Sequence, residues 1–247
     1  FAPDSDIRIM DGQAAIAFRS YHAGTAVIEA TSPGLKAARI EITFEGNDGS
    51  GKTTISKNIY EKLKKMGYPV IYTREPGGID IAEQIRNVIL NPKNTAMDAR
   101  CEALLYAASR RQHLVEKVLP ALDKGQIVLC DRFLDSSLVY QGIARGIGVQ
   151  EVYDINAFAI EGHLPDATIF LSVDLEVGLS RVSSRGNKDR LDQEGIKFHK
   201  KVAQGYDMIK ERYKERMHII DANQTVEEVE ASTLKEVLEI MNAHGQG

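Results

Sequence analysis

A glycine-rich turn between a strand-like segment and a helical pattern constrains this chain more than any other feature. Residues 38–45 predict a short β-branched strand, and a helix is expected to begin at Thr53 and Thr54. The turn matches the pattern glycine, four residues, glycine, lysine, Ser/Thr. Its residues are Gly46, Asn47, Asp48, Gly49, Ser50, Gly51 and Lys52.

The spacing of this turn predicts a binding site for phosphates. Glycines let the backbone curl so that successive N–H groups point into one concavity, and the following helix adds its positive N-terminal end. Lys52 can then reach the outer phosphates of a nucleotide, and the Thr53 hydroxyl can ligate Mg²⁺. A chance match in a glycine turn is the competing interpretation, and the strand before the turn and the helix after it disfavour that reading.

Composition restricts the class of protein. The chain has 247 residues, of which 43% are hydrophobic and 27% charged, values typical of a soluble globular protein. Its net charge of −4 argues against a protein that coats nucleic acid, and no apolar run approaches the length of a membrane span. The first residues lack the basic start and apolar stretch of a signal peptide. Cys101 and Cys130 are predicted to be buried thiols in a reducing compartment, so we expect a cytoplasmic protein.

The chain divides into a short first segment and a longer region. Residues 1–37 hold strand-like runs joined by tight turns and predict a β-rich extension, whereas residues 38–247 alternate between strand and helix patterns. The expected strands are 38–45, 69–73, 125–130, 167–173 and 218–221. The expected helices are 53–66, 80–90, 98–118, 175–183, 195–215 and 225–242, with helical pattern also from 136 and after 151. This alternation predicts an α/β fold with a parallel five-stranded sheet covered by helices on both faces.

Three polar segments directly follow strands and should meet at one edge of the sheet. They are the phosphate-binding turn, Arg74-Glu75 and Asp131-Arg132. A carboxylate in the position of Asp131 is typical of a Mg²⁺ site in P-loop proteins, and the fork of Arg132 suits a phosphate. A surface ion pair at a strand end is the competing interpretation of that dipeptide.

An aromatic ring and a guanidinium share one face of the helix expected at 98–118. Tyr106 precedes Arg110 by four residues, so the pair could cradle a nucleobase, although spacing alone favours core packing for Tyr106. Arg111 points about 100° away from Arg110, and at most one of these two arginines is expected to enter a pocket.

A run of arginines and lysines occupies residues 181–192. Such a run usually indicates a solvated loop. In a phosphoryl-transfer enzyme the same composition suits a mobile lid that brings positive charge to the transferred group.

Taken together, these residues resemble the thymidylate kinase family from about Ile40 to Asn242. The matching motifs are Phe44-Glu45-Gly46 with Asp48 and Gly49, Thr73-Arg74-Glu75-Pro76-Gly77-Gly78, Ala107-Ala108-Ser109-Arg110, Asp131-Arg132-Phe133, Asp135-Ser136-Ser137-Leu138 with Tyr140-Gln141-Gly142, and Asp189-Arg190-Leu191-Asp192. The resemblance implies the P-loop nucleoside-monophosphate kinase fold and transfer of a phosphoryl group from ATP to dTMP with Mg²⁺. It also implies a role in dTTP synthesis and a homodimer packed through helices.

The resemblance assigns expected roles to individual residues. Catalysis is expected from Lys52, Asp48, Arg132 and Arg185. ATP is expected at Gly46, Asn47, Asp48, Gly49, Ser50, Gly51, Lys52, Thr53, Thr54, Arg181 and Asn223, and Mg²⁺ at Thr53 and Asp131. The dTMP site is expected at Arg74, Glu75, Arg86, Tyr106, Arg110, Arg132, Ser137, Tyr140 and Gln141. Because family members with glycine at position 49 usually carry the catalytic arginine in the lid, Arg185 is the candidate, with Arg181 and Arg190 near it.

The family pattern does not account for residues 1–37. The run from Gly24 to Ala38 resembles part of the immunoglobulin-like modules of β-galactosidase-type glycoside hydrolases. A fragment of this length is too short to hold a core of its own. We expect it to leave the first strand on the side remote from the phosphate loop, without contacting substrate.

Three alternative functions compete with phosphoryl transfer to dTMP. A kinase for another small nucleotide would differ at the base, since thymine offers carbonyl groups where cytosine presents an amino donor. A P-loop switch or binding protein is disfavoured, because the chain lacks an Asn-Lys-x-Asp motif and carries arginines suited to an acceptor phosphate. The extension could also serve as an interaction module.

Overall fold

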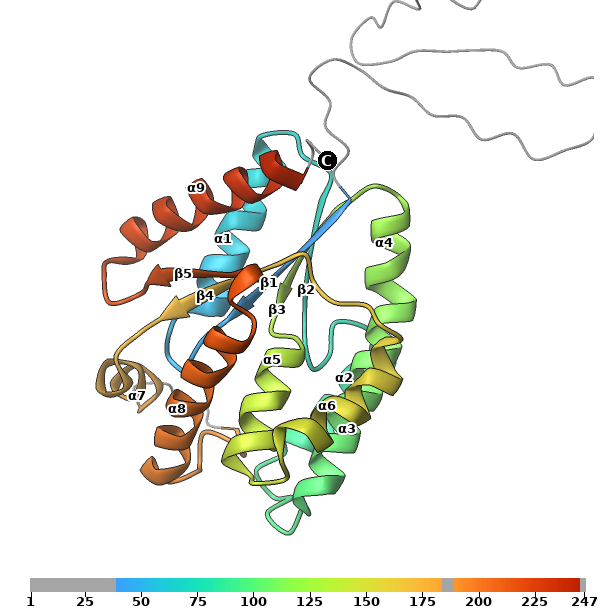
Figure 1. Ribbon diagram of the computed structural model, residues 1–247, viewed down its shortest axis with the longest axis vertical. Coiled ribbons are helices and arrows are strands. Elements are labelled where there is room, and N and C mark those ends of the chain that lie inside the picture. The colour runs from blue at the N-terminus through green and yellow to red at the C-terminus, as the bar shows by residue number, and fades with distance from the viewer. Residues whose placement is uncertain (1–38, 184–188, 245–247) are drawn as a thin grey trace, which may run out of the picture. The chain divides into compact units, whose positions relative to one another are not determined.

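The five expected strands form one parallel sheet in the order β2-β3-β1-β4-β5 (Figure 1). The computed structural model describes residues 39–183 and 189–244, which belong to the unit Lys36–Gly247. The strands are β1 Ile40–Glu45, β2 Val70–Arg74, β3 Ile127–Asp131, β4 Ala167–Ser172 and β5 Met217–Asp221. β1 is central, since it pairs with β3 on one side and β4 on the other.

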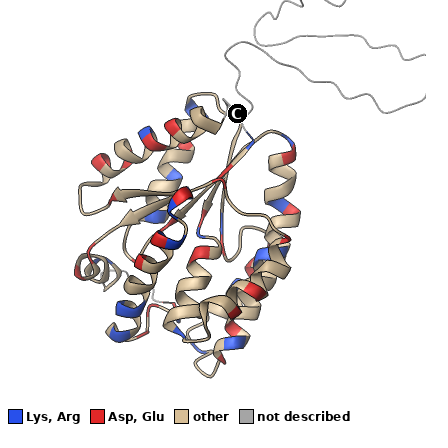
Figure 2. Ribbon diagram, viewed as in Figure 1, with Lys and Arg blue, Asp and Glu red and all other residues tan. Residues whose placement is uncertain are grey.

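Helices follow each strand and cover both faces of this sheet. They are α1 Lys52–Lys65, α2 Asp80–Leu90, α3 Ala99–His113, the π-helical η1 Leu114–Val118, α4 Leu119–Asp123, α5 Leu134–Ser137, the π-helical η2 Leu138–Ala144, α6 Val149–Ile160, α7 Leu175–Ser183, α8 Ile196–Arg212, the 3₁₀ turn η3 Lys214–Arg216 and α9 Val226–His244. Charged residues lie mainly on these helices and on loops, while most of each strand is uncharged (Figure 2).

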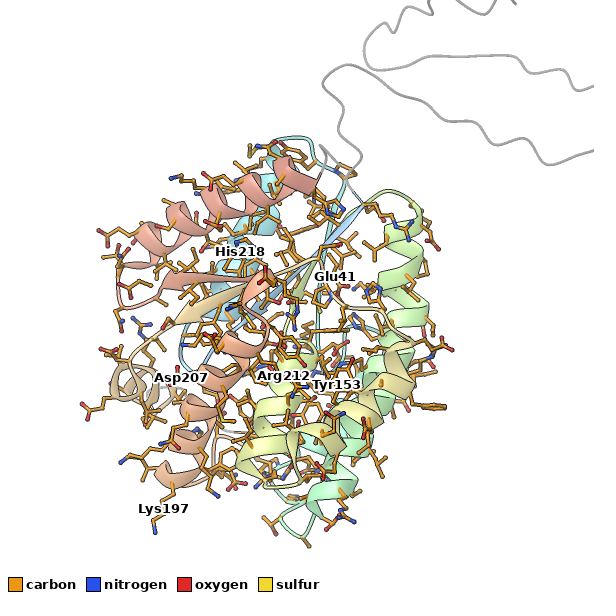
Figure 3. All side chains as sticks on the ribbon, in the orientation of Figure 1. Glu41, Tyr153, Lys197, Asp207, Arg212 and His218 are labelled. Carbon is orange, nitrogen blue, oxygen red and sulfur yellow. The ribbon has the colours of Figure 1, made fainter. Side chains whose placement is uncertain are left out.

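Alternation of side chains along the strands divides the interior into two cores. In β3, Val128 packs with residues of α8 and η2, whereas its neighbours Ile127 and Leu129 pack with α1 and α9 on the opposite face. Successive strand residues point to opposite faces, so a strand covered on both sides must be apolar throughout. Figure 3 shows side chains from both helical layers filling the space against the sheet.

Two expectations change in detail. The helix predicted to end near Pro120 continues through η1 and α4 to Asp123, because Pro120 occupies the first turn of α4, where its missing N–H is tolerated. Cys130 is buried as predicted, but Cys101 is exposed on α3, so that part of the prediction was wrong. The expectations for residues 1–37 fall outside the described residues. In the part of the chain that is described, none of the helices has the length and apolar character needed to cross a membrane.

Candidate active site

The phosphate-binding turn closes around the amine of Lys52. Its Nζ donates hydrogen bonds of 2.8 Å to the carbonyl oxygens of both Gly46 and Asn47. Gly49 has a φ of +80°, and a Cβ there would lie 2.1 Å from the Gly178 carbonyl oxygen of α7, so only glycine fits. Burial and the nearby Arg132 charge lower the pKa of Lys52 to about 8. Keeping the buried Lys52 amine charged therefore costs free energy until an anion binds beside it.

Two oxygen groups meet beside this turn, as the sequence predicted for a metal. The Thr53 hydroxyl donates to Asp131 Oδ2 at 2.5 Å. Asp131 Oδ1 is buried and has no hydrogen-bond partner among residues 39–183 and 189–244. An orphaned carboxylate oxygen next to a hydroxyl suits a hard cation such as Mg²⁺, which takes oxygen ligands and completes its shell with water and phosphate. These residues fit that ion.

A second pocket opens next to the turn and contains seven residues that the sequence predicted for catalysis or substrate binding. It is lined by Asp48, Glu75, Arg86, Tyr106, Arg132, Tyr140 and Gln141, together with Pro76, Leu90, Ser136 and residues 189, 191 and 192. Asp48 and Arg132 also line the hollow around Lys52 and Thr53. The two hollows therefore share a wall formed by a carboxylate and a guanidinium.

That shared wall is a tightly bonded group. Arg132 Nη2 donates to Asp48 Oδ1 at 2.6 Å, and the Tyr140 hydroxyl donates to Asp48 Oδ2 at 2.7 Å. Although burial acts to raise it, the charges of Arg132 and Lys52 hold the pKa of Asp48 below its ordinary value. Arg132 has a φ of +71°, a conformation that a non-glycine residue adopts only under strain of about 1–3 kcal/mol. Such strain is typical of functional positions.

The neighbouring arginines of α3, Arg110 and Arg111, point in different directions, as their spacing in the sequence predicted. Arg110 is buried, while Arg111 is partly exposed and pairs with Glu161 at 2.6 Å, so only one of the two arginines turns inward. Tyr106 lines the second pocket, and the preference for core packing that its spacing gave was wrong. Burial raises the pKa of its phenol far above the ordinary value, and Glu102 acts in the same direction.

Three predicted substrate residues lie outside the pocket lining. Arg110 donates to Glu75 Oε2 at 2.7 Å and to Ser137 and Asn156, so its guanidinium is held behind Glu75. Ser137 shares that network. Arg74 is half-exposed, and its Nη2 donates to both carboxylate oxygens of Glu83, at 2.7 and 2.9 Å. The sequence predicted these side chains for the substrate site but could not show that each is bonded to other residues of the protein.

A third hollow lies across the turn, against α7 and α9. Its lining includes Gly49, Thr54, Arg181 and Gln224. Arg181 Nη1 donates to the Ala222 carbonyl at 3.2 Å, and Asn223 Oδ1 accepts from the backbone N–H of Asp174 at 3.0 Å. Of the residues predicted to bind ATP, Gly49, Ser50, Gly51, Thr54 and Arg181 line this hollow, whereas Asn223 is not part of its lining.

The lid expectation is only partly addressed by the structure. Arg185 lies in segment 184–188, outside the described residues. Arg190 is buried, with a hydrogen bond of 2.7 Å to the Ile89 carbonyl and an ion pair with Glu102. The alternative reading of this run as a solvated loop does not hold at Arg190, because its guanidinium is buried and paired inside the protein.

Sequence reasoning missed three buried polar residues near the pocket. Glu45 accepts four hydrogen bonds from residues after β3 and from α8, and Glu102 binds Gln141, Arg145 and Arg190. His199 of α8 lies with Nδ1 3.8 Å from Asp48 Oδ2. A carboxylate within an apolar strand was the one available signal, and it applied only to Glu45.

A parallel sheet with a phosphate-binding turn after its central strand, and a second arginine-lined pocket sharing that turn, define a P-loop kinase. The family model described as thymidylate kinase matches residues 44–233. The chain belongs to the thymidylate kinase family.

Individual relatives agree with this assignment. The thymidylate kinase of Bacillus velezensis is 56% identical over 203 residues, which cover 81% of this chain and 94% of the relative. That of Clostridium novyi is 57% identical over 190 residues, covering 76% and 93%. The crystal structure of thymidylate kinase from Ehrlichia chaffeensis superposes with a TM-score of 0.65 at 33% identity, covering 81% of this chain and 98% of that chain.

Proposed function

We propose that this protein phosphorylates dTMP to dTDP with ATP, as a step in dTTP synthesis. The observation that carries the proposal is the shared wall of Asp48 and Arg132 between the phosphate hollow and the second pocket. A donor phosphate held by the turn and an acceptor phosphate in the pocket would meet at that wall. Family membership and the identity to curated thymidylate kinases support the choice of dTMP as acceptor.

In the proposed reaction an oxygen of the dTMP phosphate attacks the γ-phosphorus of ATP in line, and the bond to the ADP oxygen breaks. The protein needs no covalent intermediate, because it supplies position and charge. Lys52 neutralises the donor phosphates, and Arg132 contacts the acceptor phosphate, supported by Arg86. Asp48 orients Arg132 through their 2.6 Å contact.

The base of dTMP is proposed to lie against Tyr106, with Gln141 at its edge and Tyr140 beside the sugar. Arg110, Ser137 and Glu75 support this pocket from behind through their buried network. Arg74, paired with Glu83, is proposed to contact the acceptor phosphate only if that pair opens.

Mg²⁺ is proposed at Thr53 and Asp131, where it would neutralise charge that develops on the donor phosphates. The orphaned Asp131 Oδ1 supports this placement. We also propose that the chain is of the type with glycine at position 49 and that Arg185 brings the catalytic charge.

A homodimer, the location in the cytoplasm and the division of the chain belong to the same proposal. Two helices that contact each other each carry an exposed apolar side chain: Leu104 of α3 and Phe158 of α6, the latter 90% exposed. Covering such side chains with a second copy would remove them from water.

Residues 1–37 are proposed to be a separate β-rich extension, resembling an immunoglobulin-like fragment, and residues 38–247 the kinase domain.

A coupled assay of ADP release tests the function directly. The purified protein is offered dTMP, dUMP, dCMP, UMP and AMP with ATP and Mg²⁺. The proposal expects the highest kcat/KM with dTMP. A higher value with dCMP or AMP, or no release with any acceptor, would overturn it.

A further inference from the structure

Glu102 is a buried carboxylate in the first turn of α3 that holds three donors from two other segments. Gln141 Nε2 donates to its Oε1 at 2.8 Å, and Arg145 contacts both of its oxygens, at 3.3 and 3.2 Å. Arg190 donates to its Oε2. The side chain of Glu102 is 1% exposed, so water does not compete for these contacts. Guanidinium N–H groups face both carboxylate oxygens, so Glu102 acts toward its neighbours as a hydrogen-bond acceptor.

An acceptor-only partner decides which way the Gln141 amide faces. The two ends of a glutamine amide have nearly the same shape, and hydrogen bonding sets the orientation. Because Glu102 accepts at this contact, Gln141 directs its NH₂ group toward it and its carbonyl oxygen away from it. Among the residues described, that carbonyl oxygen receives no hydrogen bond from the protein, and Gln141 lines the second pocket.

The same carboxylate fixes one wall of that pocket. Arg190 donates from Nε to the Ile89 carbonyl at 2.7 Å and from its backbone N–H to the Leu90 carbonyl at 3.2 Å. Its chain neighbours Asp189 and Leu191 line the pocket. Arg190 thus ties the pocket wall to α2, and Glu102 holds the arginine that does so.

We propose that Glu102 is a positioning residue that sets base specificity, by presenting Gln141 to the acceptor nucleotide as a hydrogen-bond acceptor. This inference rests on the proposed function. A base with a ring N–H at its edge, such as the imide of thymine or uracil, donates to that oxygen. A base with a ring nitrogen lone pair there, such as cytosine, meets an unfavourable contact between two acceptors.

The experiment compares kcat/KM for dTMP and dCMP in the full chain and in Glu102→Gln. A glutamine at 102 can donate or accept, so the Gln141 amide is free to reverse. The ratio of kcat/KM between dTMP and dCMP is expected to fall by about tenfold, the value of one hydrogen bond to a base edge, mainly through a higher KM for dTMP. Glu194→Gln is the matched control, because Glu194 pairs with Arg145 at 2.5 Å but does not touch Gln141. Its ratio should stay at the parental value.

A double-mutant cycle separates positioning from a general structural role. In a Gln141→Ala background, Glu102→Gln should leave the ratio unchanged, because the amide through which it acts is gone. An equal fall in both backgrounds, or a parental ratio in folded Glu102→Gln, would overturn the inference.

Folding and the basic activity have their own readouts. If circular dichroism shows that Glu102→Gln does not fold, Glu102→Asp replaces it, since the shorter carboxylate cannot hold Gln141 and Arg190 together. A parental ratio in folded Glu102→Asp also overturns the inference. Failure of the parent protein to phosphorylate dTMP would instead defeat the proposed function.

Discussion

Two replacements of Glu45 should show separately how much stability depends on its hydrogen-bond acceptors and how much on its charge, since Glu45→Ala removes both and Glu45→Gln removes only the charge. Its carboxylate is fully buried at the end of β1. Oε1 accepts from the backbone N–H groups of Phe133 and Ser136 at 2.8 and 3.2 Å, and Oε2 accepts from the hydroxyls of Ser136 and Tyr206 at 2.6 and 2.9 Å. The two backbone groups can only donate, whereas the two hydroxyls can also accept.

Glu45→Ala and Glu45→Gln should therefore lower the free energy of unfolding by different amounts. Glu45→Ala leaves two buried N–H groups without a partner, at roughly 1–3 kcal/mol each, so the free energy of unfolding should fall by about 2–6 kcal/mol. Glu45→Gln can turn its carbonyl to the backbone groups and its NH₂ to the hydroxyls, and should cost no more than about 1.5 kcal/mol. Chemical denaturation followed by circular dichroism measures both. Equal stability of the alanine variant and the parent would refute this account.

The pH dependence of the glutamine variant adds a second check. Burial raises the pKa of Glu45 above its ordinary value, and Asp135 adds to the effect, so the folded state binds a proton more readily than the unfolded chain. The stability gained from that proton is complete below the unfolded pKa and is lost as pH rises through the raised folded pKa. Glu45→Gln cannot titrate, so its cost relative to the parent should be largest in acid and shrink toward neutral pH.

Substitution of Glu45 should also change the activity of the protein. Ser136, which Glu45 holds, also accepts from Arg132 Nη1 at 3.1 Å. Glu45→Ala should loosen that arginine and raise the KM for dTMP, while Glu45→Gln stays close to the parent. An alanine variant with reduced stability and a parental KM would show that the contact to Arg132 does not depend on Glu45.

Lys52→Ala should remove about 3–4 kcal/mol of transition-state stabilisation without unfolding the protein, and turnover within tenfold of the parent would contradict the assignment of the phosphate loop. Because the pKa of Lys52 is about 8 in the free protein, kcat/KM for ATP should fall as pH rises through that value, and a flat profile between pH 7 and 9.5 would contradict this. Arg185→Ala should lower kcat by about 10²-fold with little change in dTMP affinity, whereas Arg190→Ala should mainly lower the melting temperature, since it leaves the Glu102 charge buried. An Arg190→Ala protein of parental stability would show that this ion pair contributes little. Deletion of residues 1–37 should leave the specific activity unchanged, and a folded but inactive truncation would show that the extension contributes to the site.

Much of the fold followed from patterns that are local in the sequence. The phosphate-binding turn, the five strands and the helices between them each rest on neighbouring residues, since strand and helix periods are short-range properties. Parallel strands then bring their carboxyl ends to one edge, so the sequence alone predicts that Asp48, Glu75 and Arg132 lie together, as they do in the lining of the second pocket.

The partners of each charge were decided only by the tertiary structure. Arg110 is bound to Glu75, 35 residues away, and Arg190 to Glu102, 88 residues away. No local pattern distinguishes such buried arginines from Arg132, which reaches the pocket. Tyr106 shows the same limit, since a helical face turns toward core or cleft according to what packs against it. The sequence determined where functional side chains leave the backbone, and long-range packing determined which of them remain free to meet a substrate, because neutralising a buried charge requires a residue distant in the chain.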